Sequence, residues 1–244
     1  MTRFFVSEGE LGLNRAVLTG ENLAHAKVLR LKPGDTVTVC DGNGTDHTCT
    51  ISDLSQGQVS LVVRHSAPTA AEAKCAVRIF LAFAKADKLE HVVQKATELG
   101  AAEVIVFPSK RCVSTPDVGA LTKKLARWNK IAASAAAQSG RGRIPAVTAA
   151  ASFDAALAQA AQAELPVLFY ENEQRRTFRE AIGDATFASA ALMTGPEGGF
   201  SEDEVRLAQE AGMQICTLGP RILRCETAPL CALSAVLYAA GALD

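Results

Sequence analysis

A change of hydrophobic period near residue 75 constrains the fold of this 244-residue chain more than any other feature. Residues 77–83 form a nearly continuous apolar run, which is typical of a strand buried on both faces of a parallel sheet. Apolar side chains then recur at helical spacing, at Leu89, Val92, Val93, Ala96 and Leu99. Gly100 is a plausible helix end, and a second apolar run follows at 103–107. This order predicts a β–α–β unit and therefore an α/β domain.

Strands and helices continue to alternate toward the C-terminus. We expect strands at 166–170, 188–193 and 214–218, and helices at 118–138, from near 152 and at about 229–240. Asp87 with Glu90, and Ser201 with Glu204, have the spacing of capping boxes at two helix starts. Alternating elements indicate a mainly parallel sheet in residues 74–244.

The first seventy residues have a different pattern. Short β-like runs occupy 36–39, 48–51 and 59–63, and strong turn residues stand at 41–44. Short strands joined by tight turns predict a small barrel. Residues 66–74 contain Pro and many small side chains, which is typical of a linker. The sequence thus predicts two domains, 1–70 and 74–244.

Composition restricts the functional classes. We see neither a signal peptide nor an apolar stretch long enough to span a bilayer, so we expect a cytoplasmic protein with no membrane partner. The seven cysteines are scattered without a C-x-x-C pair, so we expect reduced thiols and no metal site.

Charge is unevenly distributed although the net charge is only −1. Residues 101–150 carry eight Lys or Arg against two acidic residues, whereas residues 151–210 carry four against eleven. A concentration of one sign permits docking of a polyanion, but ordinary solvated helix faces would give the same pattern.

One loop rich in glycine, residues 193–201, follows a predicted strand and runs into a predicted helix. Its segment Gly195-Pro196-Glu197-Gly198-Gly199-Phe200 leaves the backbone open to close approach by a ligand. The free N–H groups of the following helix start suit polar or anionic atoms. The segment matches neither a phosphate-binding P-loop nor a dinucleotide fingerprint, and a simple strand-to-helix turn remains an alternative.

A second loop, residues 218–229, joins another strand to the last helix. It combines Arg221, Arg224 and Glu226, which are costly to bury without a purpose. The alternative is structural: Thr227 caps the helix and Glu226 balances an arginine. Both loops follow strand C-termini, where open α/β sheets bind ligands.

Together these loops closely resemble the signature of the RsmE-type family of the SPOUT superfamily, whose members methylate N3 of a uridine in small-subunit (16S) ribosomal RNA. The matching segments are G-P-E-G-G-F at 195–200, L-G-P-R-I-L-R-x-E-T-A at 218–228, residues 25–35, Lys88-Leu89-Glu90, residues 94–100, Arg127-Trp128, Ile131-Ala132 and residues 138–141. The resemblance covers nearly the whole chain. Cys225 stands where many relatives have Thr or Ser, and Pro229 replaces a more usual Ala.

This resemblance implies a small PUA-like β-barrel domain followed by a trefoil-knotted methyltransferase domain, S-adenosylmethionine as cofactor, and a homodimer. It also implies a cofactor pocket formed by Leu168, Tyr170, Thr194, Gly195, Glu197, Gly198, Leu218, Gly219, Ile222, Leu223 and Thr227. Among polar residues we expect Arg224 to be essential, because a guanidinium can hold phosphate or stabilise negative charge on uracil. Glu197 and Glu226 are candidate proton acceptors, and pairing with Arg221 or Arg224 is an equal alternative for each.

Ribosomal RNA or the small ribosomal subunit is the expected partner. Basic residues predicted to bind it are Arg3, Lys27, Arg30, Lys32, Lys110, Arg111, Arg141 and Arg143. Three other functions remain open: a SPOUT methyltransferase with another RNA target, a non-enzymatic RNA-binding or assembly factor, and a nucleotide-binding hydrolase. The last lacks a nucleophile elbow or a phosphate loop. The sequence leaves open the target nucleotide, the choice between free RNA and assembled subunit, and the proton acceptor.

Overall fold

The computed structural model describes residues 2–55, 57–183 and 186–243, which form two compact units. The first unit contains the chain up to Glu72 together with residues 136–144, and the second contains 73–135 and 145 onward. Met1 and Asp244, the outer bounds of the two predicted domains, lie outside the described residues.

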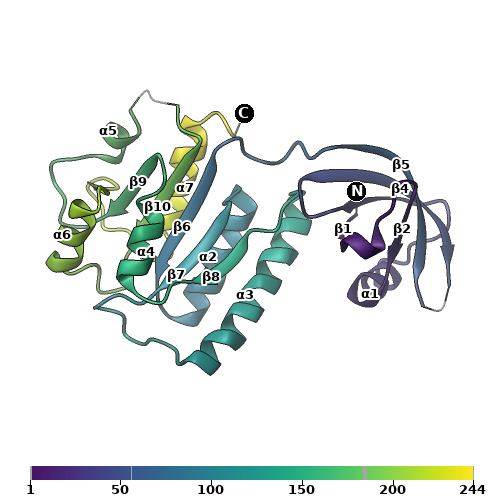
Figure 1. Ribbon diagram of the computed structural model, residues 1–244, viewed down its shortest axis with the longest axis horizontal. Helices are drawn as coiled ribbons and strands as arrows, with labels where there is room; N and C mark the ends of the chain where they lie inside the picture. The colour runs from purple at the N-terminus through teal and green to yellow at the C-terminus, as the bar shows by residue number, and fades with distance from the viewer. Residues whose placement is uncertain (1, 56, 184–185, 244) are drawn as a thin grey trace. The chain divides into compact units, whose positions relative to one another are not determined.

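A five-stranded mixed sheet in the order β1-β3-β4-β5-β2 forms the first unit (Figure 1). Its elements are β1 (Arg3–Phe5), η1 (Glu8–Glu10), β2 (Arg15–Leu18), α1 (Gly20–Val28), β3 (Thr36–Cys40), β4 (Thr45–Leu54) and β5 (Val59–Pro68). Strand β1 pairs with β3 in parallel, and the other pairs are antiparallel. The sheet has edges at β1 and β2, so the barrel expected from the sequence is open.

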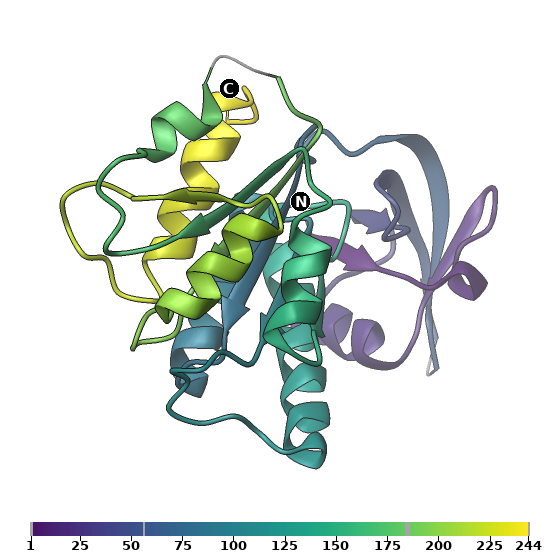
Figure 2. The same cartoon turned by 60° about the vertical axis from the view of Figure 1, so that its left-hand side comes forward.

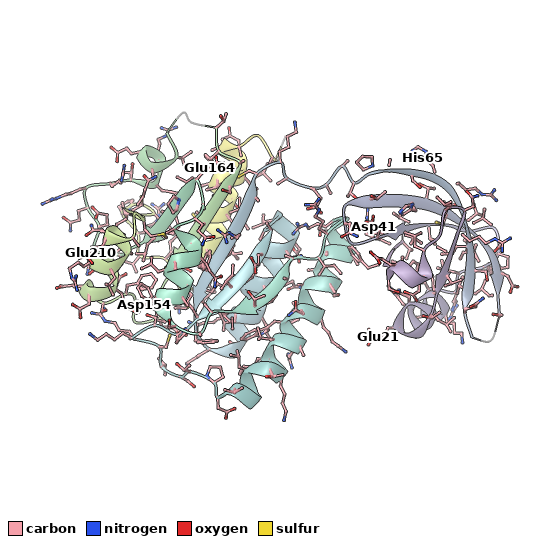
Figure 3. The ribbon with its side chains drawn as sticks, in the orientation of Figure 1. Glu21, Asp41, His65, Asp154, Glu164 and Glu210 are labelled. Carbon is pink, nitrogen blue, oxygen red and sulfur yellow. The ribbon has the colours of Figure 1, made fainter. Side chains whose placement is uncertain are left out.

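The predicted turn between β3 and β4 forms for local reasons. Asp41, labelled in Figure 3, accepts hydrogen bonds through its carboxylate from the backbone N–H groups of Asn43 (2.7 Å) and Thr45 (3.0 Å). Gly42 and Gly44 have φ values of 75° and 98°, which favour glycine. Strand β5 runs to Pro68, so the first residues of the predicted linker belong to the sheet.

Six parallel strands in the order β11-β9-β10-β6-β7-β8 form the sheet of the second unit. The strands are β6 (Ala76–Ala82), β7 (Glu103–Phe107), β8 (Ala146–Ala149), β9 (Leu165–Phe169), β10 (Ser189–Thr194) and β11 (Gln214–Cys216). The helices are α2 (Ala86–Leu99), α3 (Val118–Ser139), α4 (Phe153–Ala160), α5 (Phe178–Ile182), α6 (Glu202–Glu210) and α7 (Ala228–Ala239). The predicted α/β class with a parallel sheet is confirmed.

Helices cover both faces of this sheet. Helices α4 and α6 lie together over one face, where Phe80, Phe107, Leu168, Met193 and Phe200 share one buried cluster. Helices α2 and α7 pack against each other on the opposite face, with α7 against β6 and β10 (Figure 2). Burial on both faces explains why β6 and its neighbours are continuous apolar runs rather than alternating ones.

Helix ends agree with the sequence except at the start of α2. Ser201 caps α6, with Glu204 completing the predicted capping box. Helix α2 ends at Gly100, which has a φ of 110°. Its predicted capping box is wrong: the N-cap is Lys85, so Asp87 lies two residues too late in the chain to cap the helix.

Strand order determines where the loops meet. Strands β11, β9, β10 and β6 are successive neighbours, and all four are parallel. Their carboxyl ends therefore share one edge of the sheet, although they are far apart in sequence. The two signature loops and the β6–α2 connection converge at this edge.

Candidate functional site

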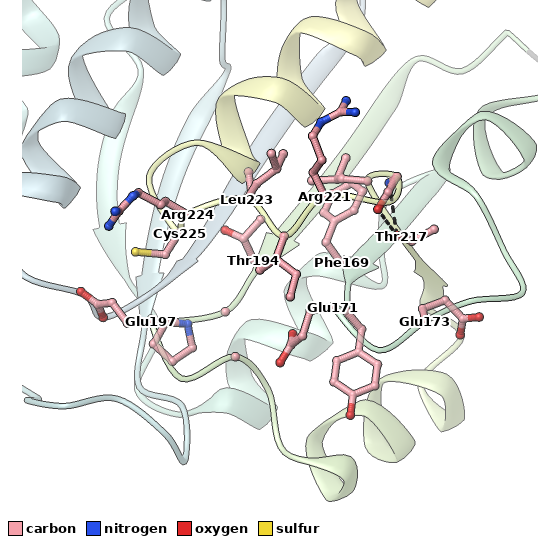
Figure 4. Close-up of a pocket in the computed structure, with 18 of the residues that line it drawn as sticks. Phe169, Glu171, Glu173, Thr194, Glu197, Thr217, Arg221, Leu223, Arg224 and Cys225 are labelled. Atoms are coloured by element: carbon pink, nitrogen blue, oxygen red, sulfur yellow. Dashed lines mark hydrogen bonds between the residues drawn. The ribbon is translucent and has the colours of Figure 1, made fainter.

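A cavity of about 580 Å³ opens at the carboxyl edge of the parallel sheet. Three segments supply most of its wall: the ends of β9 and β10 with their following loops, and the loop between β11 and α7. The lining residues are Lys88, Phe169, Tyr170, Glu171, Glu173, Gln174, residues 194–199, residues 217–225 and Ala228. Figure 4 shows Glu197 on one side of this space and Arg224 with Cys225 on the loop that faces it.

The β10–α6 loop owes its close approach to glycine. A Cβ on Gly195 would lie 3.1 Å from the carbonyl carbon of Gly199, and a Cβ on Gly198 would lie 3.1 Å from the Cβ of Arg111. The Arg111 side chain also donates a hydrogen bond to the Gly198 carbonyl at 3.1 Å. The loop is thus packed tightly on its outer side, and its backbone is open toward the cavity.

Glu171 faces this loop from the end of β9 (Figure 4). A Cβ on Gly199 would lie only 2.0 Å from the Glu171 Oε1 atom, and Gly199 has a φ of 66°. The carboxylate therefore occupies the space that the missing side chain leaves. This places a negative charge in the cavity wall, where hydroxyl or ammonium groups of a ligand could bind.

The loop between β11 and α7 is the opposite wall. Gly219 adopts a φ of 104°, and its N–H donates a hydrogen bond to the Thr217 hydroxyl at 3.2 Å. Arg221 and Arg224 are exposed side chains of the cavity wall. Thr227 occupies the N-cap position of α7 but makes no side-chain capping bond.

Lys88 connects the two walls. Its Nζ atom lies 3.3 Å from Glu197 Oε1 and 3.3 Å from Glu226 Oε2, and it also contacts Cys225 Sγ at 3.5 Å. The three charged side chains are only 20–23% exposed. Within the described residues the two carboxylates pair with Lys88, whereas pairing with Arg221 or Arg224 was the alternative expected from the sequence.

These contacts shift the protonation equilibria of the carboxylates. Burial alone would raise the pKa of Glu197, but hydrogen bonds from its own backbone, from the Lys85 backbone and from Lys88 lower it below the ordinary value. A hydrogen bond from its own backbone, with smaller contributions from Cys225 and Lys88, lowers the pKa of Glu226. Both groups are therefore anionic at neutral pH.

The pKa values of the neighbouring Lys88 and Cys225 are raised instead. Desolvation works to lower the pKa of Lys88, yet its bonds to Glu226 and Glu197 raise it. Burial raises the pKa of the Cys225 thiol to about 11. The cluster at physiological pH consists of two carboxylates, one ammonium and a neutral thiol.

Most residues predicted to bind the cofactor line the cavity. They are Tyr170, Thr194, Gly195, Glu197, Gly198, Leu218, Gly219, Ile222 and Leu223. Leu168 and Thr227 are not in its lining. Leu168 is fully buried because its side chain belongs to the core beneath α4 and α6, and the adjacent Phe169 faces the cavity instead.

The residues predicted to bind RNA fall into separate groups. Lys27, Arg30 and Lys32 are exposed in the first unit. Arg3 is bound to Asp46, with Nη2 2.7 Å from Oδ2. Arg141 is 3% exposed and donates to Glu72 Oε2 at 2.8 Å, so its guanidinium is a structural group inside the first unit.

Three more of these basic residues also have intramolecular partners. Arg143 donates a hydrogen bond to the Asn43 carbonyl at 3.4 Å. In the second unit, Lys110 pairs with Asp203 at 3.1 Å, while Arg111 holds the glycine-rich loop. Lys27, Arg30 and Lys32, in α1 and the turn after it, are exposed and are therefore the members of the predicted set best placed to contact RNA.

Sequence reasoning did not single out Lys88, Phe169 or Glu171 as site residues. A weak signal existed for Lys88, which is the third residue of α2. A cation in the first turn opposes the positive end of the helix dipole and is stabilised there only by nearby acids. The acids that pair with it lie on loops distant in sequence, and the sequence does not show that these loops meet.

Three further findings concern the described residues. They contain no group of three or more His, Cys, Asp or Glu side chains arranged to hold a metal ion. No described helix is both long and apolar enough to cross a membrane. All seven cysteines are free thiols, four of them buried.

Comparison with known proteins defines the class first. Residues 71–237 match the model of an RNA methyltransferase domain, and residues 18–64 match that of an RNA methyltransferase PUA domain. Fold, cavity and both matches describe an RNA methyltransferase with an N-terminal PUA domain.

Individual relatives narrow the class. The chain is 37% identical to ribosomal RNA small subunit methyltransferase E of Bacillus subtilis, covering 98% of this chain and 96% of the relative. It is 33% identical to the same enzyme of Mycobacterium bovis, covering 91% and 85%. A crystal structure of that methyltransferase from Neisseria gonorrhoeae bound to S-adenosylmethionine has a TM-score of 0.88 at 32% identity, covering 98% and 97%. The chain belongs to the family of ribosomal RNA small subunit methyltransferase E, as its resemblance to the RsmE-type family predicted.

Proposed function

We propose that this protein transfers a methyl group from S-adenosylmethionine to N3 of a uridine in small-subunit ribosomal RNA. The observation that carries the proposal is the glycine-walled cavity at the carboxyl edge of the parallel sheet, formed by both signature loops. A backbone-lined cavity at this edge is where α/β folds bind flat ligands. The family membership supports RNA as the substrate.

The cavity fits such a cofactor. Its volume of about 580 Å³ lies within the range of pockets for small ligands. Among the described hydrogen bonds, none uses the backbone N–H groups of Leu218, Ile222 or Leu223, which leaves three donors for a heterocycle or a carboxylate. Glu171 would face hydroxyl or ammonium groups. The bound cofactor would supply an electrophilic methyl group on a sulfonium.

The chain's own residues would prepare the nucleobase. N3 of uridine carries a proton and takes part in base pairing, so the base must be unpaired or turned out of its stack. Arg224 is exposed at the cavity wall and can stabilise the negative charge that develops on the ring when N3 loses its proton. Glu197 and Glu226 are the candidate acceptors of that proton, and both are held in the anionic form that acceptance requires.

RNA would be positioned through phosphate contacts. Lys27, Arg30 and Lys32 form an exposed basic group on the first unit, and such groups bind the RNA backbone with strong salt dependence. The structure of the RNA around the target, rather than a duplex sequence, would select the site.

Three family features also belong to this proposal: a homodimer, a trefoil knot near the cofactor loops, and a cytoplasmic location. Ile222 and Tyr238 support the dimer, because these large apolar side chains are 84% and 74% exposed in the cavity loop and in α7. Light scattering of the purified protein measures its mass. A monomer at micromolar concentration would contradict the dimer.

The deciding experiment is methyl transfer from labelled S-adenosylmethionine to small subunits that lack the modification, followed by nucleoside analysis. We expect label in 3-methyluridine. Label in another nucleoside would show that the protein is a methyltransferase with a different target. Cofactor binding without transfer to free RNA or assembled subunits would favour a non-enzymatic RNA-binding role.

A further inference from the structure

We propose that Lys88 is a positioning residue that ties the two cofactor loops to helix α2 and thereby holds the cofactor cavity in its binding shape. The inference rests on the proposed function, since it assigns a task to a residue beside the cavity that this function uses.

Geometry is the first support. Glu197 belongs to the loop after β10, and Glu226 belongs to the loop after β11. A single Nζ atom contacts carboxylate oxygens of both at 3.3 Å. Among the described residues, no direct hydrogen bond or ion pair joins the two loops to each other. The ammonium of Lys88 is therefore the polar link between them.

Anchoring is the second support. Lys88 lies in the first turn of α2, and the backbone N–H of Lys85, the N-cap of that helix, donates to Glu197 Oε1 at 3.3 Å. Helix α2 packs against α7, the helix into which the second loop runs. The lysine thus connects both loops to a helix that packs against α7, which itself packs on β6 and β10.

Electrostatics is the third support. A lysine in the first turn opposes the helix dipole, so its presence there needs compensation by acids. Here two carboxylates share one ammonium in a setting that is only about one-fifth exposed, as the side-chain exposures of 20–23% show. Without the ammonium the two anions would repel each other, and the loops that carry them would separate.

Binding of S-adenosylmethionine to the full-length protein, measured by calorimetry, tests the inference without relying on turnover. We expect Lys88→Met to weaken binding by about tenfold or more, because one partner of a partly buried charge cluster is lost. Lys88→Arg retains the charge and should recover a large part of the affinity. In steady-state kinetics the KM for S-adenosylmethionine should rise more than the KM for the ribosomal subunit.

Lys95→Met is the matched control. Lys95 lies on the same helix and forms an ion pair with Glu98 at 2.8 Å, but it does not line the cavity. We expect this variant to bind S-adenosylmethionine like the wild type. Circular dichroism and the melting temperature establish that each variant is folded.

If Lys88→Met fails to fold, Glu226→Gln provides the test, since it removes one ion pair with Lys88, preserves shape and changes a residue outside the cavity lining; we expect it to weaken S-adenosylmethionine binding as well. We expect Lys88→Met combined with Glu226→Gln to weaken binding less than the two single effects together. Wild-type affinity in Lys88→Met, or equal losses in Lys88→Met and Lys95→Met, would overturn the role of Lys88. Absence of binding by the wild type would overturn the proposed function, and the inference with it.

Discussion

The two signature loops of the second unit and the basic residues of the first unit differ in what positions their side chains. In the second unit, residues from three strand ends converge on one cavity. In the first unit, Lys27 is exposed whereas Arg141 is buried against Glu72. Parallel topology brings strand-end loops to one edge whatever their distance in sequence. Charge alone does not reveal whether a side chain faces solvent or an internal partner.

The largest effect that would test this contrast is a loss of stability in Arg141→Met. The substitution leaves Glu72 without the partner that Arg141 provides, and breaking such a buried pair costs about 3–5 kcal/mol. Hydrogen exchange of the β3–β5 amides measures the free energy of unfolding of the first unit. An unchanged stability together with weaker RNA binding would instead show that Arg141 contacts RNA.

The same pair has a pH signature. Burial works to raise the pKa of Glu72, but hydrogen bonds from Arg141 and from the Gly142 and Arg143 backbones lower it below its ordinary value of 4.5. The resulting stabilisation is complete above that value and is lost as the pH falls through the lowered pKa. Stability of the first unit should therefore fall in acid more steeply in the wild type than in Arg141→Met.

Next in size is the effect of Arg224→Ala on turnover. Arg224 is exposed at the cavity, so its removal should leave folding unchanged and cut kcat by about 100-fold, as loss of a group that stabilises developing charge does. Single-turnover experiments measure the rate of methyl transfer, and calorimetry measures the affinity for S-adenosylmethionine. Normal turnover in a folded Arg224→Ala protein would remove this residue from the mechanism.

A smaller effect is expected for Gly199→Ala. The new methyl group would collide with Glu171 and would force a residue with a side chain into a φ of 66°, which costs about 1–2 kcal/mol. S-adenosylmethionine binding should weaken together with stability, because Glu171 must move within the cavity wall. Gly212→Ala is the control: its φ of 87° is equally unfavourable, but it lies at the end of α6 with free space around it. Equal loss of binding in both variants would contradict the steric explanation.

The smallest effect concerns RNA. Lys27→Ala should weaken binding to the small subunit a few-fold and reduce the slope of log affinity against log salt by about one, with S-adenosylmethionine binding unchanged. Filter binding at several salt concentrations measures the slope. Arg206→Ala removes an exposed cation from the acidic part of the chain and should leave the slope as it is. An equal change in both variants would show a nonspecific charge effect.

Several features of the fold and the site could be predicted because they depend on local chemistry. The apolar run of β6, the capping box of α6 and the glycine at the end of α2 are each encoded within a few residues. The glycine-rich loop could be recognised for the same reason. The start of α2 was misplaced by two residues, because the spacing of Asp87 and Glu90 fits a capping box whose geometry the chain does not adopt there.

The sequence by itself determined the alternation of strands and helices, the tight loops that follow strand ends, and the membership of a methyltransferase family. Those properties depend on backbone preferences, hydrophobic period and short motifs. Only the tertiary structure decided that Lys88 joins Glu197 to Glu226, that Arg141 is internal, and that Phe169 rather than Leu168 faces the cavity. The physical reason is that burial and charge pairing depend on which segments cross in space.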